Sequence, residues 1–164
     1  MTMTVTIDEL ERIRDECKSM VTARAGLSAG AAVVPIPGAD VGADVMLLLE
    51  MIPAINRRFG SSSEQIDLLD PQVKKMILVA ATSIGSEMIG RVLTKQVIMQ
   101  VLKRIGIRVA TKQVAKYIPF LGSAVAASIS FGAMKLVGNS HADDCFEVAK
   151  RALLGADSRT RQHA

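Results

Sequence analysis

The chain has 164 residues, of which 49% are hydrophobic and 22% are charged. It is therefore long enough for one folded domain and too apolar for a disordered chain. Aromatic residues make up only 3%, which argues against proteins that stack unpaired bases on exposed rings. The net charge of +4 is unevenly spread: residues 71–117 hold nine basic residues and one acid, whereas residues 26–56 hold three acids and no base. This segregation of charge indicates a docking surface more than the total does.

The cysteines and the N-terminal residues indicate in which cellular compartment the protein is expected. Cys17 and Cys145 lie far apart with no CxxC spacing, so we expect no zinc site. The chain starts without the basic and then apolar pattern of a signal peptide. We therefore expect a cytoplasmic protein with reduced thiols, with association to a membrane left open.

The first predicted helix spans residues 6–24, because apolar residues recur at helical spacing from Ile7 onward. Thr6 and Glu9 have the spacing of a capping box at its start. A corner follows that no helix interior tolerates, and its residues are Pro35, Pro37 and Gly38.

The second predicted helix runs from about Val41 to Phe59. Asp40 is expected to cap its start and Gly60 to end it. Pro53 lies inside this stretch and predicts a kink.

Two cap signals precede the basic middle of the chain. Ser61 and Glu64 have capping-box spacing, and Asp70-Pro71 is typical of an N-cap with proline at the first helical position. Helical spacing then continues to residue 92 and on to residue 105, so we expect helix throughout this region with a break near Gly106.

The last third of the chain repeats this arrangement. Pro119 and Gly122 form a second corner, followed by an apolar helix over residues 123–137. Residues 138–140 are expected to end it, with Ser140 capping a last helix that stops at Gly155. Small residues at four-residue spacing are expected to let helices pack closely; they are Ala124, Ser128 and Gly132.

The two corners carry a weak internal repeat. Val34-Pro35-x-x-Gly38 matches Ile118-Pro119-x-x-Gly122, and small residues follow each copy. No stretch alternates as a strand does. We therefore predict an all-α, compact bundle of roughly five to seven helices built from two helical hairpins with Pro-Gly corners. Its predicted parts are an N-terminal amphipathic helix (1–25), a helical domain (26–154) and a flexible tail (155–164).

Residues that carry chemistry are few. The chain has no G-x-x-x-x-G-K-[ST], no G-x-S-x-G and no H-E-x-x-H. Potential metal ligands gather at residues 141–145, but only His141 and Cys145 share a helix face, and a capped, exposed helix start explains the same residues. Asp40 and Asp44 are better explained by their place at a helix start than as a catalytic pair. We therefore expect no enzyme, no catalytic residue, no metal and no cofactor.

The order of the Pro-Gly corners, Phe59-Gly60 and Gly138 resembles a known family. It is the poorly characterised helical domain that accompanies bacterial Era-like GTPases, and it is similar to the helical part of interferon-inducible immunity-related GTPases. The resemblance covers residues 26–154. It implies a helical accessory module, often linked to membranes and without catalytic residues. The GTP-binding half is missing from this chain, so the resemblance implies a separate GTP-binding partner.

Three functions remain open. The first is a peripheral module that docks on an anionic membrane, on a GTPase partner or on both, with a homo-oligomer also conceivable because the chain is so apolar. The residues expected to bind are basic, and four of them follow i+4 steps: Lys95, Lys103, Arg104, Arg108, Lys112 and Lys116.

The second function is membrane insertion by residues 27–49 and 119–137. The later segment has one charge, Lys135, but Asp40 and Asp44 make the earlier one costly to insert. The third function is nucleic-acid binding through the basic middle, which the absence of aromatic interleaving and of helix-turn-helix spacing disfavours.

Overall fold

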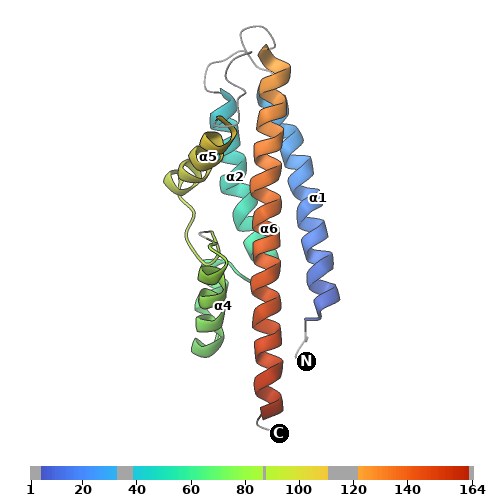
Figure 1. The fold of residues 1–164 in the computed structure, drawn as a ribbon, viewed down its shortest axis with the longest axis vertical. Coiled ribbons are helices and arrows are strands. Elements are labelled where there is room, and N and C mark those ends of the chain that lie inside the picture. Colours follow the sequence, from blue (N-terminus) through green and yellow to red (C-terminus); the bar gives the residue numbers. More distant parts are fainter. Residues whose placement is uncertain (1–4, 33–38, 87, 111–121, 163–164) are drawn as a thin grey trace. The chain divides into compact units, whose positions relative to one another are not determined.

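A computed structural model describes residues 5–32, 39–86, 88–110 and 122–162 (Figure 1). These residues contain no strand, which confirms the all-α class. Their helices agree in number with the prediction, and they are α1 (Ile7–Ala32), α2 (Ala39–Arg58), α3 (Ser63–Asp67), α4 (Pro71–Ser83), α5 (Lys95–Ala110) and α6 (Gly122–Gln162).

The chain divides into two compact units that interleave along the sequence. The first unit combines Met1–Ser19, Ile52–Val92 and Asn139–Ala164, and the second combines Met20–Met51 and Leu93–Gly138. Helices α1, α2 and α6 therefore each supply residues to both units.

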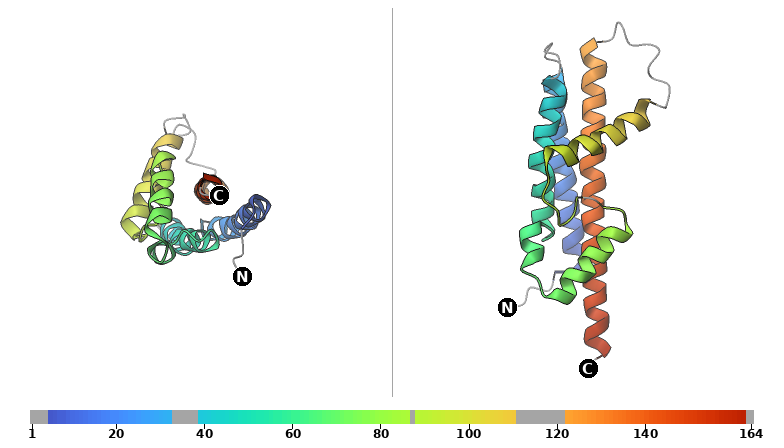
Figure 2. Two further views of the ribbon diagram at one scale, coloured as in Figure 1. Left: turned by 90° about the horizontal axis from the view of Figure 1, so that it is seen from below. Right: turned by 90° about the vertical axis from the view of Figure 1, so that its left-hand side faces the viewer.

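The first unit buries one face of α4 and the ends of α1, α2 and α6 around an aliphatic core. Its large buried side chains include Leu10, Ile52, Ile55, Ile66, Ile77, Met88, Ile89, Phe146 and Val148. Helix α4 lies beside α6 (Figures 1 and 2). Gly155 permits this contact, because a Cβ there would lie 2.7 Å from Cε of Met76.

The second unit packs α1, α2, α5 and α6 around its own core. The buried side chains are Val21, Ala25, Val45, Leu48, Met51, Ile98, Met134 and Val137. A Cβ at Gly138 would lie 2.6 Å from Cγ2 of Val21 and 2.9 Å from Cε of Met51. Glycine at this position therefore lets α6 approach α1 and α2 closely.

Helix α6 continues past two positions where the sequence predicts a helix end. It runs without interruption from Gly122 through Gly138 and Gly155 to Gln162. The predicted stop at residues 138–140, the cap at Ser140 and the end at Leu154 are therefore wrong. Both glycines lie at tight contacts between helices, and this use of glycine leaves the backbone helical.

Several predicted caps are present. Thr6 Oγ1 accepts a hydrogen bond from N of Glu9 at 3.2 Å, and Asp70 caps α4 with Pro71 at the first helical turn. Gly60 ends α2 with a φ of 67°. The next residue closes the turn, because N of Ser61 donates to the carbonyl of Asn56 at 2.8 Å.

Because of that turn, the N-cap of α3 lies one residue later than the sequence predicts. Ser62, and not Ser61, is the N-cap of α3, and it forms a capping box with Gln65 in place of Glu64. Ser61 is not available as a cap because its backbone already completes the end of α2. At the start of α2, Asp40 lies inside the first turn of a helix that begins at Ala39, so its predicted role as the cap is wrong.

The basic middle of the chain is also divided differently. Helix α4 ends at Ser83, and Gly85 follows with a φ of 74°, so helix does not continue to residue 92. Helix α5 passes through Gly106 to Ala110, so the predicted break is wrong. Of the predicted corners, Pro35, Pro37, Gly38 and Pro119 lie outside the described residues, and Gly122 begins α6.

Candidate functional site

A polar cluster lies in the core of the first unit. Asn56 and Ser61 come from the end of α2, while His141 and Cys145 lie one turn apart on α6. His141 is 0% exposed, Cys145 1% and Asn56 2%. The prediction that residues 141–145 form an exposed helix start is therefore wrong, because α6 carries them through the core.

Asn56 organises the cluster. Its Nδ2 donates to the carbonyl of Met88 at 3.0 Å, which leaves Oδ1 to accept. Oδ1 lies 2.8 Å from Nε2 of His141 and 3.5 Å from Sγ of Cys145. This amide orientation assigns the proton of His141 to Nε2. Nδ1 then becomes a buried acceptor with no partner in the described part of the chain.

The end of α2 supplies the rest of the cluster. The turn at Gly60 brings the Ser61 hydroxyl to 3.2 Å from the carbonyl of Asn56 and 3.8 Å from Sγ of Cys145. The carbonyl of Ser61 accepts from N of Gly90 at 3.1 Å. The loop after α4 is thus hydrogen-bonded to the end of α2 at both Met88 and Gly90.

Cysteine, histidine and asparagine are the residue types of one class of nucleophilic catalyst, but their geometry here differs. Cys145 and Asn56 both face Nε2 of His141, so the ring does not lie between them with one nitrogen toward the thiol and the other toward the amide, as a proton relay requires. Burial lowers the pKa of His141 to about 4 and raises the pKa of the Cys145 thiol. The cluster thus holds a neutral imidazole and a neutral thiol, and it supplies no activated nucleophile.

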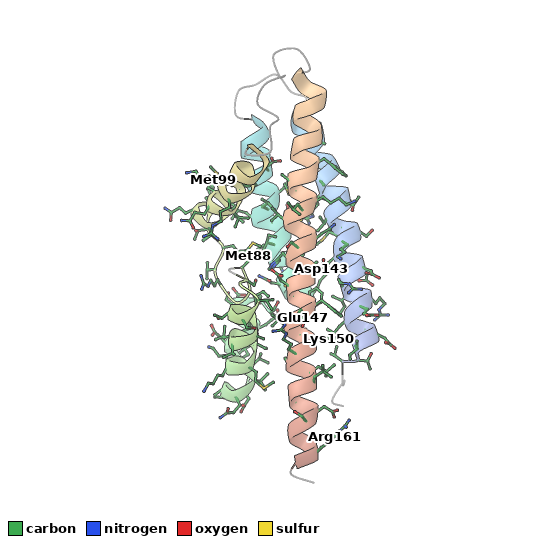
Figure 3. All side chains as sticks on the ribbon, in the orientation of Figure 1. Met88, Met99, Asp143, Glu147, Lys150 and Arg161 are labelled. Atoms are coloured by element: carbon green, nitrogen blue, oxygen red, sulfur yellow. The ribbon has the colours of Figure 1, made fainter. Side chains whose placement is uncertain are left out.

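Two acidic residues, Asp143 and Asp144, lie next to the cluster in the sequence. Asp143 lies on α6 (Figure 3) and is exposed. Its Oδ1 lies 2.6 Å from Nζ of Lys18. The pKa of Asp144 is raised by its partial burial and by the charge of Asp143. Within the described ranges no three histidine, cysteine or acidic side chains are grouped closely enough to hold a metal ion.

Four of the predicted basic residues lie on α5, which has no acidic residue. Lys95, Lys103 and Arg104 are exposed, and Arg108 follows Arg104 by one turn of the same helix. We call these four residues the basic segment of α5. Lys112 and Lys116 lie outside the described residues.

The predicted small-residue positions all lie on α6, as Ala124, Ser128 and Gly132. Gly132 is exposed, and no atom of the described residues lies within 4 Å of a Cβ built there. The tight contact belongs to Gly138, where the sequence predicts the end of a helix. Its spacing from Met134 and Val137 on the apolar face of α6 was the available signal.

Among the described residues, no helix is both long and apolar enough to cross a membrane. No family model, curated protein or solved structure matches the chain.

Proposed function

We propose that the protein is a non-enzymatic helical accessory module that docks on an anionic membrane surface through the basic segment of α5. The observation that carries this proposal is the continuity of α5 through Gly106, with four bases and no acid. An uninterrupted helix keeps Arg104 and Arg108 one turn apart, next to the exposed Lys103. Each base near an anionic surface contributes about 1 kcal/mol at low salt, so the segment acts as a group.

Peripheral docking is favoured over insertion by the contacts of the apolar part of α6. Met134 and Val137 are buried in the core of the second unit. Gly138 meets Val21 and Met51 there. These side chains are occupied by protein contacts, which a spanning helix would have to exchange for lipid.

A separate GTP-binding protein is the second proposed partner. It rests on the family resemblance, and the same basic segment would then meet an acidic face of that protein. Association of two copies and nucleic-acid binding are the remaining alternatives, and nucleic-acid binding is one outcome of the experiment below.

The test is co-sedimentation with vesicles of phosphatidylglycerol and phosphatidylcholine at low and high salt. We expect binding to anionic vesicles at low salt, release at high salt and no binding to pure phosphatidylcholine. The triple variant Lys103→Glu, Arg104→Glu and Arg108→Glu should bind about a hundredfold more weakly, because three contributions of about 1 kcal/mol are lost.

A control variant carries the same change in net charge elsewhere. Arg12→Glu, Arg57→Glu and Arg161→Glu reverse exposed bases on α1, α2 and α6 and should leave vesicle binding within about threefold of the parent. Equal losses in both variants would show that total charge, and not α5, governs binding. Binding that survives high salt would instead support insertion. Absence of vesicle binding, with retention of duplex DNA on a filter, would replace the membrane proposal by nucleic-acid binding.

A further inference from the structure

A groove of about 450 Å³ lies between α4 and α6 in the first unit. The ribbons of these two helices are neighbours in Figures 1 and 2. Its apolar wall consists of Met76, Val79 and Ala80 from α4 and Ala152 from α6. Val79 is 60% exposed, although it lies on a helix that packs against the core. The groove therefore presents apolar surface that the fold leaves uncovered.

Two contacts hold the helices on either side of the groove. Towards the start of α4, the side chain of Met76 lies against Gly155 of α6. At the end of α4, Nη1 of Arg151 donates to Oγ of Ser83 at 2.9 Å. Met76, Ser83 and Arg151 themselves line the groove, so packing and a hydrogen bond between the two helices fix part of its wall.

The groove is bordered by positive charge. Lys75 is exposed, and in the described part of the chain it makes no ion pair. Arg151 also lines the groove, where its Nε donates to Glu147 at 2.8 Å and its Nη1 donates to Ser83, so Glu147 offsets part of its charge. Helix α4 contains two lysines and no acidic residue. An apolar wall between a lysine and an arginine is complementary to a molecule with an apolar body and an anionic end.

We infer that this groove binds a single acyl chain with an anionic head group, with the chain along Met76 and Val79 and the head group at Lys75 or Arg151. The volume falls in the range of small-molecule sites, roughly 300–1,000 Å³, which favours one chain over a protein partner. The basic segment of α5 belongs to the other unit. The inference therefore goes beyond the proposed docking function, and the α5 triple variant should retain the groove's ligand.

The groove has a local reporter in Met76. Methyl-¹³C-methionine NMR of the full chain, with the Met76 signal assigned through Met76→Leu, should show a saturable shift when laurate is added below its micelle concentration. Acetate, which has the head group alone, should leave the signal in place. Dodecyltrimethylammonium, which has the same chain and a cationic head group, should bind at least about tenfold more weakly than laurate.

Two substitutions separate the chain contact from the head-group contact. Val79→Glu places a carboxylate on the apolar wall and should weaken laurate binding by about tenfold or more. Lys75→Glu should weaken laurate while strengthening the cationic detergent. The matched control is Leu136→Glu, at a side chain that is 57% exposed on α6 in the other unit, and it should bind laurate as the parent does.

Three results would overturn the inference. They are a Met76 signal that does not respond to laurate, equal affinity for the anionic and cationic detergents, and equal losses for Val79→Glu and Leu136→Glu. The first would show that the groove is empty of this ligand class, the second that binding is merely apolar, and the third that the chain lies elsewhere.

Discussion

His141 occupies the middle of α6 with no exposed surface and a single ring nitrogen engaged. Burial lowers its pKa to about 4, because the charged ring would lose its hydration and Nδ1–H would find no acceptor in the described residues. Between about pH 4 and pH 6.5 the ring is therefore neutral in the folded state, where Asn56 holds it, and protonated in the unfolded chain. This makes one residue a source of pH-dependent stability.

The pH dependence has a defined sign. The histidine of the unfolded chain takes up a proton near pH 6.5, whereas His141 in the folded protein does so only at about 4. Its stability contribution is complete above pH 6.5 and is lost as the pH falls through this window, by up to about 1.4 kcal/mol per pH unit. Urea unfolding should therefore give a free energy about 2 kcal/mol lower at about pH 5 than at about pH 7.

The variant His141→Gln separates this effect from that of the carboxylates. Glutamine can still donate to Oδ1 of Asn56 but does not titrate. Its unfolding free energy should be lower than that of the parent at neutral pH, and the difference between the two should shrink as the pH falls. A constant difference from neutral to acid pH would show that His141 is not the titrating group.

Two glycines of α6, Gly132 and Gly138, differ in what surrounds them. Gly138 meets Val21 and Met51 at distances that exclude a side chain, whereas Gly132 is exposed with no described atom within 4 Å of a Cβ. Both glycines cost the helix similar backbone entropy. Only at Gly138 does a close contact between helices offset this cost.

The two glycines therefore predict opposite effects of the same substitution. Gly138→Ala should lower the free energy of unfolding by about 1–3 kcal/mol, because the methyl group overpacks the contact with Val21 and Met51. Gly132→Ala should raise it by up to about 1 kcal/mol through helix propensity. Thermal and urea unfolding followed by circular dichroism measures both, and a stabilising Gly138→Ala would contradict the packing described for α6.

The two cysteines report on whether the first of the two units is folded. Cys17 of α1 is 0% exposed and Cys145 of α6 is 1% exposed, and both belong to the first unit. Burial raises the pKa of each thiol. Neither is therefore available as a thiolate while that unit is folded.

Thiol labelling should follow opening of the first unit. In native buffer both cysteines should react with an aromatic disulfide reagent about a thousandfold more slowly than an exposed cysteine, because reaction requires unfolding. Added urea should accelerate both with the same dependence. Ser158→Cys, which places a thiol at an exposed position of α6, provides the fast reference. A rapid reaction of either native cysteine would contradict its burial.

Features that depend on neighbours in the chain follow from the sequence. Gly60 ends α2, and Asp70 caps α4, since the hydrogen bonds of such turns span only a few residues. The all-α class follows in the same way from helical spacing. The placement of basic residues on α5 also follows, although the sequence wrongly predicted a break at Gly106.

The candidate sites depend on contacts between segments that are distant in the chain. A glycine looks alike in the sequence whether it ends a helix, as Gly60 does, or admits a second helix, as Gly138 and Gly155 do. Likewise, the sequence predicts His141 at an exposed helix start, whereas in the structure it lies inside α6 and is buried. Local hydrogen bonds determined where the chain turns, while burial against distant helices decided which polar and small residues lie inside, because packing energy depends on partners that sequence spacing does not specify.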